Sequence, residues 1–242
     1  MIEWHIGCSG FQYKHWRGAF YPEKLAQKDW FLYYASQFNT VELNVTFYRF
    51  PEPATVKSWY DKSPVDFTFT VKAPRIITHF KKLNDCEELL HSFYEIIGNG
   101  FKEKLGCVLF QFPPRYSYTK DKIKKVIASM NSSFMNVLEF RHLSWWNDEV
   151  FSLLSAHNIT FCGTSHPLLP TDIIINVPVV YYRLHGIPDL YKSPYKLTEL
   201  KSIVNTINSN KKIKKAFLYF NNDIDGSAVF NGKQILNILP DV

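Results

Sequence analysis

Hydrophobic and polar residues alternate strictly along residues 41–49, and this stretch sets the pattern for much of the chain. Apolar side chains occupy the odd positions from 41 to 47, and Glu42, Asn44 and Thr46 occupy the even ones. Alternation with a period of two predicts a β-strand with two different faces. Several later strands repeat the pattern, with charged or amide side chains near their C-terminal ends. We therefore expect the polar face to point into a shared interior, and a closed barrel is the simplest fold with this property.

The whole chain fits this expectation. Strands are predicted over residues 5–11, 41–49, 67–73, 107–112, 136–142, 159–163, 179–185 and 215–220. Helices are predicted over about 29–38, 54–62, 86–98, 120–130, 147–156, 197–208 and 227–238, with glycines 98 and 100 ending the third. Strands that alternate with helices predict parallel βαβ units, and eight units predict one (β/α)8 TIM-like barrel domain over residues 1–242. The alternative, an open doubly wound sheet, usually has fewer strands. No Gly-x-Gly-x-x-Gly or P-loop motif follows any strand, and the sequence indicates no particular cofactor.

Polar residues on the inward faces lie mostly in the C-terminal halves of the strands, where barrels of this type place their sites. The inward set comprises Glu42, Asn44, Thr46, Thr68, Thr70, Lys72, Gln111, Glu139, Arg141, Tyr181, Arg183, His185, Tyr219 and Asn221. Buried charges are costly unless they are paired or solvated in a cleft. A buried ion network that only fixes the barrel is the structural alternative for any single residue, whereas the whole set favours a site.

The interior carries a surplus of positive charge, because three bases face Glu42 and Glu139. Lys72, Arg141 and Arg183 would be balanced by a phosphate or carboxylate ligand, and arginine binds such groups with two parallel donors. The two glutamates facing one cavity are the candidates for general acid and base. Lys72 is interpreted first as a counter-ion of a glutamate, and alternatively as a base or Schiff-base lysine of lowered pKa.

The leading hypothesis is an enzyme that binds a small anionic substrate at the barrel mouth, with Glu42, Lys72 and Glu139 as catalytic residues. The reaction class stays open between hydrolysis, isomerisation and lyase chemistry. Residues predicted to bind or orient the substrate are Asn44, Tyr48, His79, Gln111, Arg141, Arg183, His185, Asn221 and Asn222. We expect His79 and the aromatic loop over residues 13–21 to cover the ligand.

Two other functions remain open at this point. In a metal-assisted phosphoesterase or nuclease, Glu42, Glu139 and His185 would be the ligands, but the neighbouring bases oppose a cation. Glu139 and His142 do not form a Glu-x-x-His pair, because positions i and i+3 of a strand face opposite ways. A nucleic-acid-binding or protein-binding module is the other alternative, and there is no Gly-x-Ser-x-Gly elbow to support a serine hydrolase.

Composition narrows the setting. The formal charge is +6, but the lysine-rich runs at 120–125 and 211–215 lack interleaved aromatics, so solvated surface is favoured over a nucleic-acid patch. No apolar stretch approaches the roughly 20 residues of a membrane span. The four cysteines form no Cys-x-x-Cys pair, which favours buried, reduced thiols and a cytoplasmic protein. The N-terminus enters a strand without a signal-peptide pattern.

The motifs laid out in order resemble the YecE-like family, a domain of unknown function with a TIM-like barrel. The resemblance is carried by Gly-Cys-Ser-Gly at 7–10, Val-Glu-Leu-Asn at 41–44, Leu-Phe-Gln-Phe-Pro-Pro at 109–114, Glu-Phe-Arg-His at 139–142, Arg-Leu-His-Gly at 183–186 and Tyr-Phe-Asn-Asn at 219–222. It implies the barrel and a cytoplasmic, mostly prokaryotic setting. It implies no activity and no cofactor.

Overall fold

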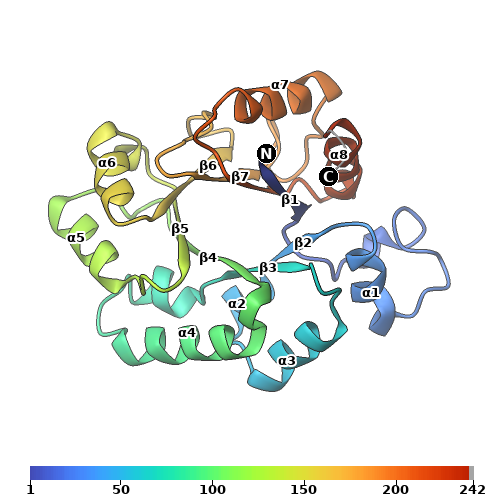
Figure 1. The fold of residues 1–242 in the computed structure, drawn as a ribbon, viewed down its shortest axis with the longest axis horizontal. Coiled ribbons are helices and arrows are strands. Elements are labelled where there is room, and N and C mark those ends of the chain that lie inside the picture. Colours follow the sequence, from blue (N-terminus) through green and yellow to red (C-terminus); the bar gives the residue numbers. More distant parts are fainter. Residues whose placement is uncertain (240–242) are drawn as a thin grey trace.

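The protein is built on eight parallel strands that follow one another around a nearly closed barrel, as the computed structural model shows for residues 1–239 (Figure 1). The strands are β1 (Glu3–Cys8), β2 (Thr40–Leu43), β3 (Thr68–Lys72), β4 (Leu105–Phe112), β5 (Met135–Phe140), β6 (Thr160–Ser165), β7 (Val179–Leu184) and β8 (Lys215–Phe220). The helices are α1 (Trp30–Ala35), α2 (Val45–Tyr48), α3 (Pro53–Lys62), α4 (Glu87–Phe101), α5 (Lys120–Ser129), α6 (Asp148–Ala156), α7 (Leu197–Asn208) and α8 (Ser227–Ile238). This architecture confirms the predicted (β/α)8 TIM-like barrel.

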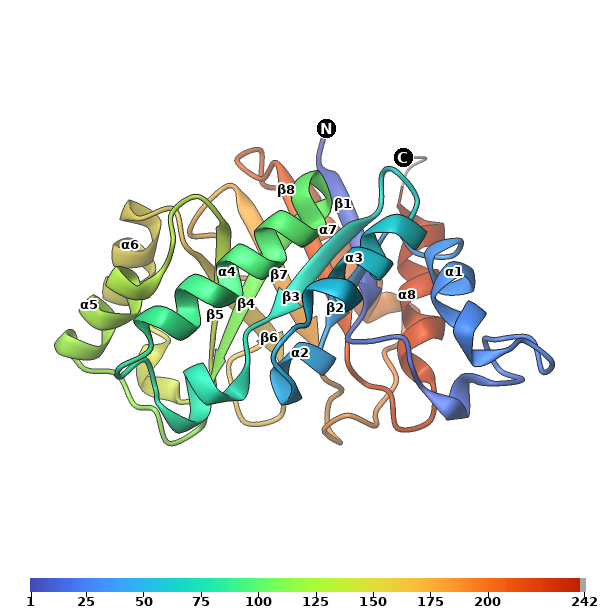
Figure 2. The same ribbon diagram turned by 90° about the horizontal axis from the view of Figure 1, so that it is seen from below.

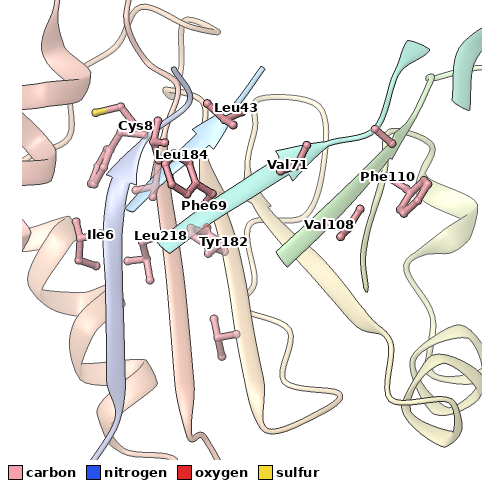
Figure 3. Close-up of a cluster of buried hydrophobic side chains, with 14 of the residues drawn as sticks. Ile6, Cys8, Leu43, Phe69, Val71, Val108, Phe110, Tyr182, Leu184 and Leu218 are labelled. Atoms are coloured by element: carbon pink, nitrogen blue, oxygen red, sulfur yellow. The ribbon is translucent and has the colours of Figure 1, made fainter. Parts of the chain in front are cut away.

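The strands separate two apolar layers. One lies between the strands and the surrounding helices, and the other fills the inside of the barrel. Side chains that point outward, such as Ile6, Val71 and Leu218, pack against the helices (Figure 3). The inward layer is smaller and fills the lower part of the barrel with Cys107, Leu109, Val137, Cys162, Tyr181, Phe217 and Tyr219. The barrel is therefore a packed core with its polar residues gathered toward one end.

The barrel is closed between β1 and β2 by side chains. These two strands lie side by side, but within residues 1–239 they are the two ends of the hydrogen-bonded sheet, whose order is β1-β8-β7-β6-β5-β4-β3-β2. The amide of Asn39 spans the seam, since its Nδ2 donates to Trp4 O at 2.7 Å and its Oδ1 accepts from the Ile6 amide at 3.0 Å. The Tyr34 hydroxyl accepts from the Cys8 amide and donates to Thr40 O.

Gly7 makes this close approach possible, and Gly7→Ala is expected to destabilise the protein by about 2 kcal/mol. A Cβ at position 7 would lie 2.2 Å from Thr40 O, a backbone atom that cannot swing away. Urea unfolding measures the loss, and Ser155→Ala on the exposed face of α6 is the control. An unchanged unfolding midpoint in Gly7→Ala would contradict this account of the seam.

The predicted strand over 41–49 is too long. β2 ends at Leu43, Asn44 has helical dihedral angles, and α2 follows directly. Leu43 is in register with Val71 of β3, so a longer β2 would run alongside Pro74, which has no N–H to donate to a ladder. Thr46 instead donates to Leu43 O and Lys72 O, which stabilises the turn. The alternation of apolar and polar residues continues past the point where backbone partners exist.

Other predicted bounds also differ from the structure, and two of the differences have a clear cause. The strand predicted over 136–142 ends at Phe140. Phe140 pairs with Phe112 of β4, so the next residue of β5 would pair with Pro113, which has no N–H to donate. Helix α4 runs through both glycines at its predicted end to Phe101. A Cβ on Gly100 would lie 2.3 Å from the Val56 side chain, so this glycine serves the close packing of α3 on α4. The four cysteines are buried and unpaired, as predicted.

The strands run in parallel from the end that carries the N-terminus toward the end where α2 lies (Figure 2). Their C-terminal ends therefore meet at one rim, and the loops that follow them form the mouth of the barrel. Among the described residues, no helix combines the length and apolarity needed to cross a membrane.

Candidate functional site

A cavity of about 510 Å³ opens at the mouth of the barrel. Its walls come from the C-terminal ends of the strands and from the loops after β1, β2, β7 and β8. The lining residues are Tyr13, His15, Asn44, Phe47, Tyr48, Lys72, Gln111, Arg141, Arg183, Tyr191, Asn221, Asp223 and Ile224. The structure thus brings Lys72 and most of the predicted substrate-binding residues to one cavity.

Glu42 lies beneath the cavity and is fully buried. Its Oε1 accepts from Ser9 Oγ at 2.7 Å and from Arg183 Nη2 at 2.7 Å, and its Oε2 accepts from the Tyr181 hydroxyl at 2.5 Å. Glu42 on β2 and Arg183 on β7 both point into the barrel interior, so the two side chains meet although their strands are not neighbours. Glu42 is not among the residues that line the cavity, whereas Arg183, which donates to it, is.

Glu139 has a similar environment on β5. Its two oxygens accept from Arg141 Nε and, at 2.5 Å, from Arg183 Nη1. Burial disfavours the charged carboxylate, but the charges of Arg141 and Arg183 outweigh burial and hold the pKa of Glu139 well below its usual range. Arg183 therefore bridges the two glutamates, and both carboxylates are occupied by guanidinium groups.

Lys72 is left without a carboxylate, so its interpretation as a counter-ion of a glutamate is wrong. Among residues 1–239 its ammonium group forms no ion pair, and Nζ lies 4.2 Å from the centre of the Phe47 ring. Burial, followed by the charge of Arg183, lowers the pKa of Lys72 to about 7, although Glu139 and Glu42 act in the opposite direction. The side chain is 8% exposed and opens onto the cavity.

His185 supports the guanidinium of Arg141. Arg141 Nη2 lies 3.0 Å from His185 Nε2, and the Asn221 amide lies 3.0 Å from Nδ1. Arginine can only donate, so Nε2 is the unprotonated nitrogen of the ring. Burial, followed by the charge of Arg141, holds the pKa of His185 well below its usual range, in keeping with a neutral imidazole. His185 is fully buried and acts on the cavity through Arg141.

Besides Glu42, Glu139 and His185, two further predicted residues do not line the cavity. Asn222 is fully buried on the outward side of β8, where Nδ2 donates to Ser193 O and Asn231 Oδ1. His79 lies in a helical turn after β3 and packs edge-on against Phe47, with ring centres 4.9 Å apart. Burial and the charge of Lys72 lower the pKa of His79 to about 4, so this ring is neutral at pH 7.

The structure adds a pair that the sequence did not single out. His15 Nε2 lies 3.0 Å from Asp223 Oδ2, and the Trp16 indole donates to Asp223 Oδ1 at 2.8 Å. Burial raises the pKa of Asp223 to about 6 despite the opposing effects of Trp16 and His15. These residues are about 200 positions apart, and the only signal was that each lies in a segment predicted to border the mouth.

The metal-ligand set considered from the sequence does not form. The oxygens of Glu42 and Glu139 point at arginines, and His185 Nε2 accepts from Arg141. Within the described part of the chain, no cluster of three or more His, Cys, Asp and Glu is placed to hold a metal ion. A cationic neighbour at each candidate ligand opposes a second cation.

The comparisons with known proteins agree with the motifs. Residues 5–241 match the family described as "Protein of unknown function DUF72". The chain belongs to the DUF72 family. The UPF0759 protein YunF of Bacillus subtilis is 27% identical over 255 residues, which covers 90% of this chain and 89% of YunF. The UPF0759 protein YecE of Escherichia coli is 40% identical over 110 residues, covering 45% of this chain and 40% of YecE.

Solved structures of the DUF72 family share the barrel. A family member from Thermotoga maritima has a TM-score of 0.89 and 30% identity, covering 99% of this chain and all of that one. A member from Enterococcus faecalis has a TM-score of 0.82 and 19% identity, covering 98% and 97% of the two chains. These findings confirm the YecE-like resemblance and the TIM-like barrel, and they name no activity.

Proposed function

We propose that this DUF72 protein is an enzyme that binds a small molecule bearing a phosphate or carboxylate group in the mouth cavity. The observation that carries the proposal is Lys72, a buried amine that faces the cavity without a carboxylate partner among the described residues. Glu139, Glu42 and the Phe47 ring stabilise the charged amine only in part, because burial and Arg183 still lower its pKa, and an anionic ligand would add the missing compensation. The cavity volume of about 510 Å³ is in the range of small-molecule sites.

The binding groups lie around that amine. Arg141 lines the cavity and uses only Nε and one Nη for its partners among residues 1–239, so donors remain for a ligand. Asn44, Gln111 and Asn221 add amides to the cavity lining. Tyr48 lies at the rim and is 65% exposed. In this proposal the anion contacts Arg141 and Lys72, and the amides orient the rest of the molecule.

The sequence suggested Glu42 and Glu139 as general acid and base, but we propose other residues for these roles. Each oxygen of Glu42 and Glu139 already accepts from a donor, and neither side chain lines the cavity. We assign them the positioning of Arg183 and Arg141. Lys72 and the His15–Asp223 pair face the cavity and take the proton transfers.

Anion binding tests the proposal directly. Inorganic phosphate and pyruvate, titrated separately up to about 10 mM, are the probes, with calorimetry and thermal unfolding as readouts. We expect at least one of them to bind and to raise the melting temperature. Arg141→Gln is expected to weaken that binding about 10-fold or more, because charge-assisted hydrogen bonds are lost.

Arg115→Gln, on the exposed surface after β4, is the matched control and should bind as the unmodified protein does. Equal affinity in Arg141→Gln and in the unmodified protein would show that the anion binds elsewhere. No binding of either probe would remove the support for an anion site in the cavity.

A further inference from the structure

Lys72 is placed for covalent chemistry as well as for charge. It is the last residue of β3, and Thr46 donates to its carbonyl at 2.6 Å, so the backbone that carries the amine is held from α2. Its Nζ lies over the Phe47 ring and opens to the cavity. An amine fixed in this way presents its lone pair to a bound substrate whenever it is not protonated.

The neighbouring charges keep the amine from becoming an ordinary ammonium group. Arg183 donates hydrogen bonds to both Glu42 and Glu139, and Arg141 donates to the other oxygen of Glu139. The two guanidiniums are then cations close to Lys72, with both carboxylates committed to them. Burial and the charge of Arg183 lower the pKa of Lys72 to about 7, so about half of the amine is neutral at that pH. A lysine kept only for stability would gain more from pairing with one of the glutamates.

We propose that Lys72 is a Schiff-base nucleophile, and that the substrate is a small aldehyde or ketone that carries a carboxylate or phosphate group. This inference rests on the anion site proposed above, because Arg141 would bind the anionic group and place the carbonyl carbon beside Nζ. It adds a reaction class and a substrate class to that site.

The chemistry balances without any further reactant. The Nζ lone pair attacks the carbonyl carbon, and the oxygen takes up a proton to give a carbinolamine. The nitrogen loses a proton, the C–O bond breaks with uptake of a second proton by the leaving oxygen, and one water is released. The product is a protonated imine between Nζ and the former carbonyl carbon, so the reaction takes up one proton overall, and water reverses it. Protonated, this imine withdraws electrons from the adjacent carbon, which suits aldol, decarboxylation or isomerisation steps.

Two other groups that line the cavity can carry the protons. His15 and Asp223 line the cavity 3.0 Å from each other, and the pKa of Asp223, raised by burial to about 6, lies near neutrality. A group with a pKa close to the working pH exchanges protons efficiently in both directions. Lys72 would thus be the nucleophile, and the His15–Asp223 pair would transfer the protons.

Reductive trapping tests the inference on the whole protein. The protein is incubated at pH 7.5 with pyruvate, dihydroxyacetone phosphate or the neutral dihydroxyacetone, each with sodium cyanoborohydride, and peptides are mapped by mass spectrometry. We expect one reduced adduct at Lys72 with pyruvate or with dihydroxyacetone phosphate, at least about 10-fold more than at any other lysine. Pyruvate alone would identify a carboxylate substrate, and dihydroxyacetone phosphate alone would identify a phosphate.

Two variants complete the test. Lys72→Met should give no adduct in this region, and Lys57→Met, at an exposed lysine of α3, should label as the unmodified protein does. The mapping on the unmodified protein stands even if Lys72→Met fails to fold. Adducts spread evenly over exposed lysines, or equal labelling of Lys72 by neutral dihydroxyacetone, would overturn the inference.

The outcome also separates the two proposals. Binding of phosphate or pyruvate that depends on Arg141, without any trapped adduct at Lys72, would overturn the Schiff base and leave the anion site standing. Absence of both binding and adduct would overturn both.

Discussion

Arg183→Met is expected to lower the free energy of unfolding at pH 7 by about 4 kcal/mol, because it leaves two buried carboxylates without their shared cation. Arg183 is 1% exposed and donates to Glu42 and Glu139, which are themselves fully buried. Urea denaturation measures the loss. Arg115→Met, at an exposed position after β4, is the control and should stay within about 0.5 kcal/mol of the unmodified protein.

The pH dependence of this loss has a defined sign. The folded-state pKa of Glu139 is depressed, so its contribution to stability is present above the unfolded pKa of about 4.3 and is lost as the pH falls toward the folded value. In Arg183→Met, Glu139 keeps Arg141 but loses its second cation, so the pKa of Glu139 is expected to rise. The difference in stability between the two proteins should therefore be large at pH 7 and shrink toward pH 4. A loss below about 1 kcal/mol at pH 7 would contradict the bridging role of Arg183.

Lys72 is expected to react with a trace of acetic anhydride at pH 7 on the order of 30-fold faster than an ordinary lysine of pKa about 10.4. The neutral fraction favours Lys72 roughly a thousandfold, and the lower nucleophilicity of a less basic amine takes back part of this advantage. Its rate should rise with pH and level off above pH 7, since the pKa of Lys72 is about 7. Competitive labelling between pH 5 and pH 10 with peptide mapping gives both quantities.

Substituting a charged neighbour of Lys72 tests whether the labelling curve reports the pKa of this amine. Arg183 and Arg141 lower the pKa of this amine, and Glu139 and Glu42 raise it. Arg141→Gln removes one cation, so the midpoint of the labelling curve should move to higher pH. A rate at Lys72 that keeps rising to pH 10 together with the other lysines would show that the amine is an ordinary ammonium group.

Much of the barrel could be predicted from local patterns. The predicted bounds of α7, β8 and α8 agree with the structure, because each has clear periodicity and a definite end. The inward faces were also predicted, since the parity of a strand position fixes which way its side chain points. Glu42, Glu139 and Arg183 do share the interior, as the alternation of their strands indicated.

Strand ends were predicted less well, because they depend on the neighbouring strand. The apolar and polar alternation continues from Leu43 to Phe47, yet β2 stops where β3 reaches Pro74. β5 stops where β4 reaches Pro113. A proline in one strand removes the donor that the adjacent strand would need, and the sequence of the adjacent strand does not contain this information.

Alternation along single strands was enough to predict the fold class and the charges that face the interior. How those charges pair depends on the assembled barrel. Within residues 1–239, the arrangement of β2, β5 and β7 brought Arg183 between Glu42 and Glu139 and left Lys72 facing the cavity without a carboxylate partner. The pairing of β1 with β8 brought His15 beside Asp223. The physical reason is that alternation fixes a direction along one strand, whereas ion pairing depends on distances across the barrel between residues far apart in the chain.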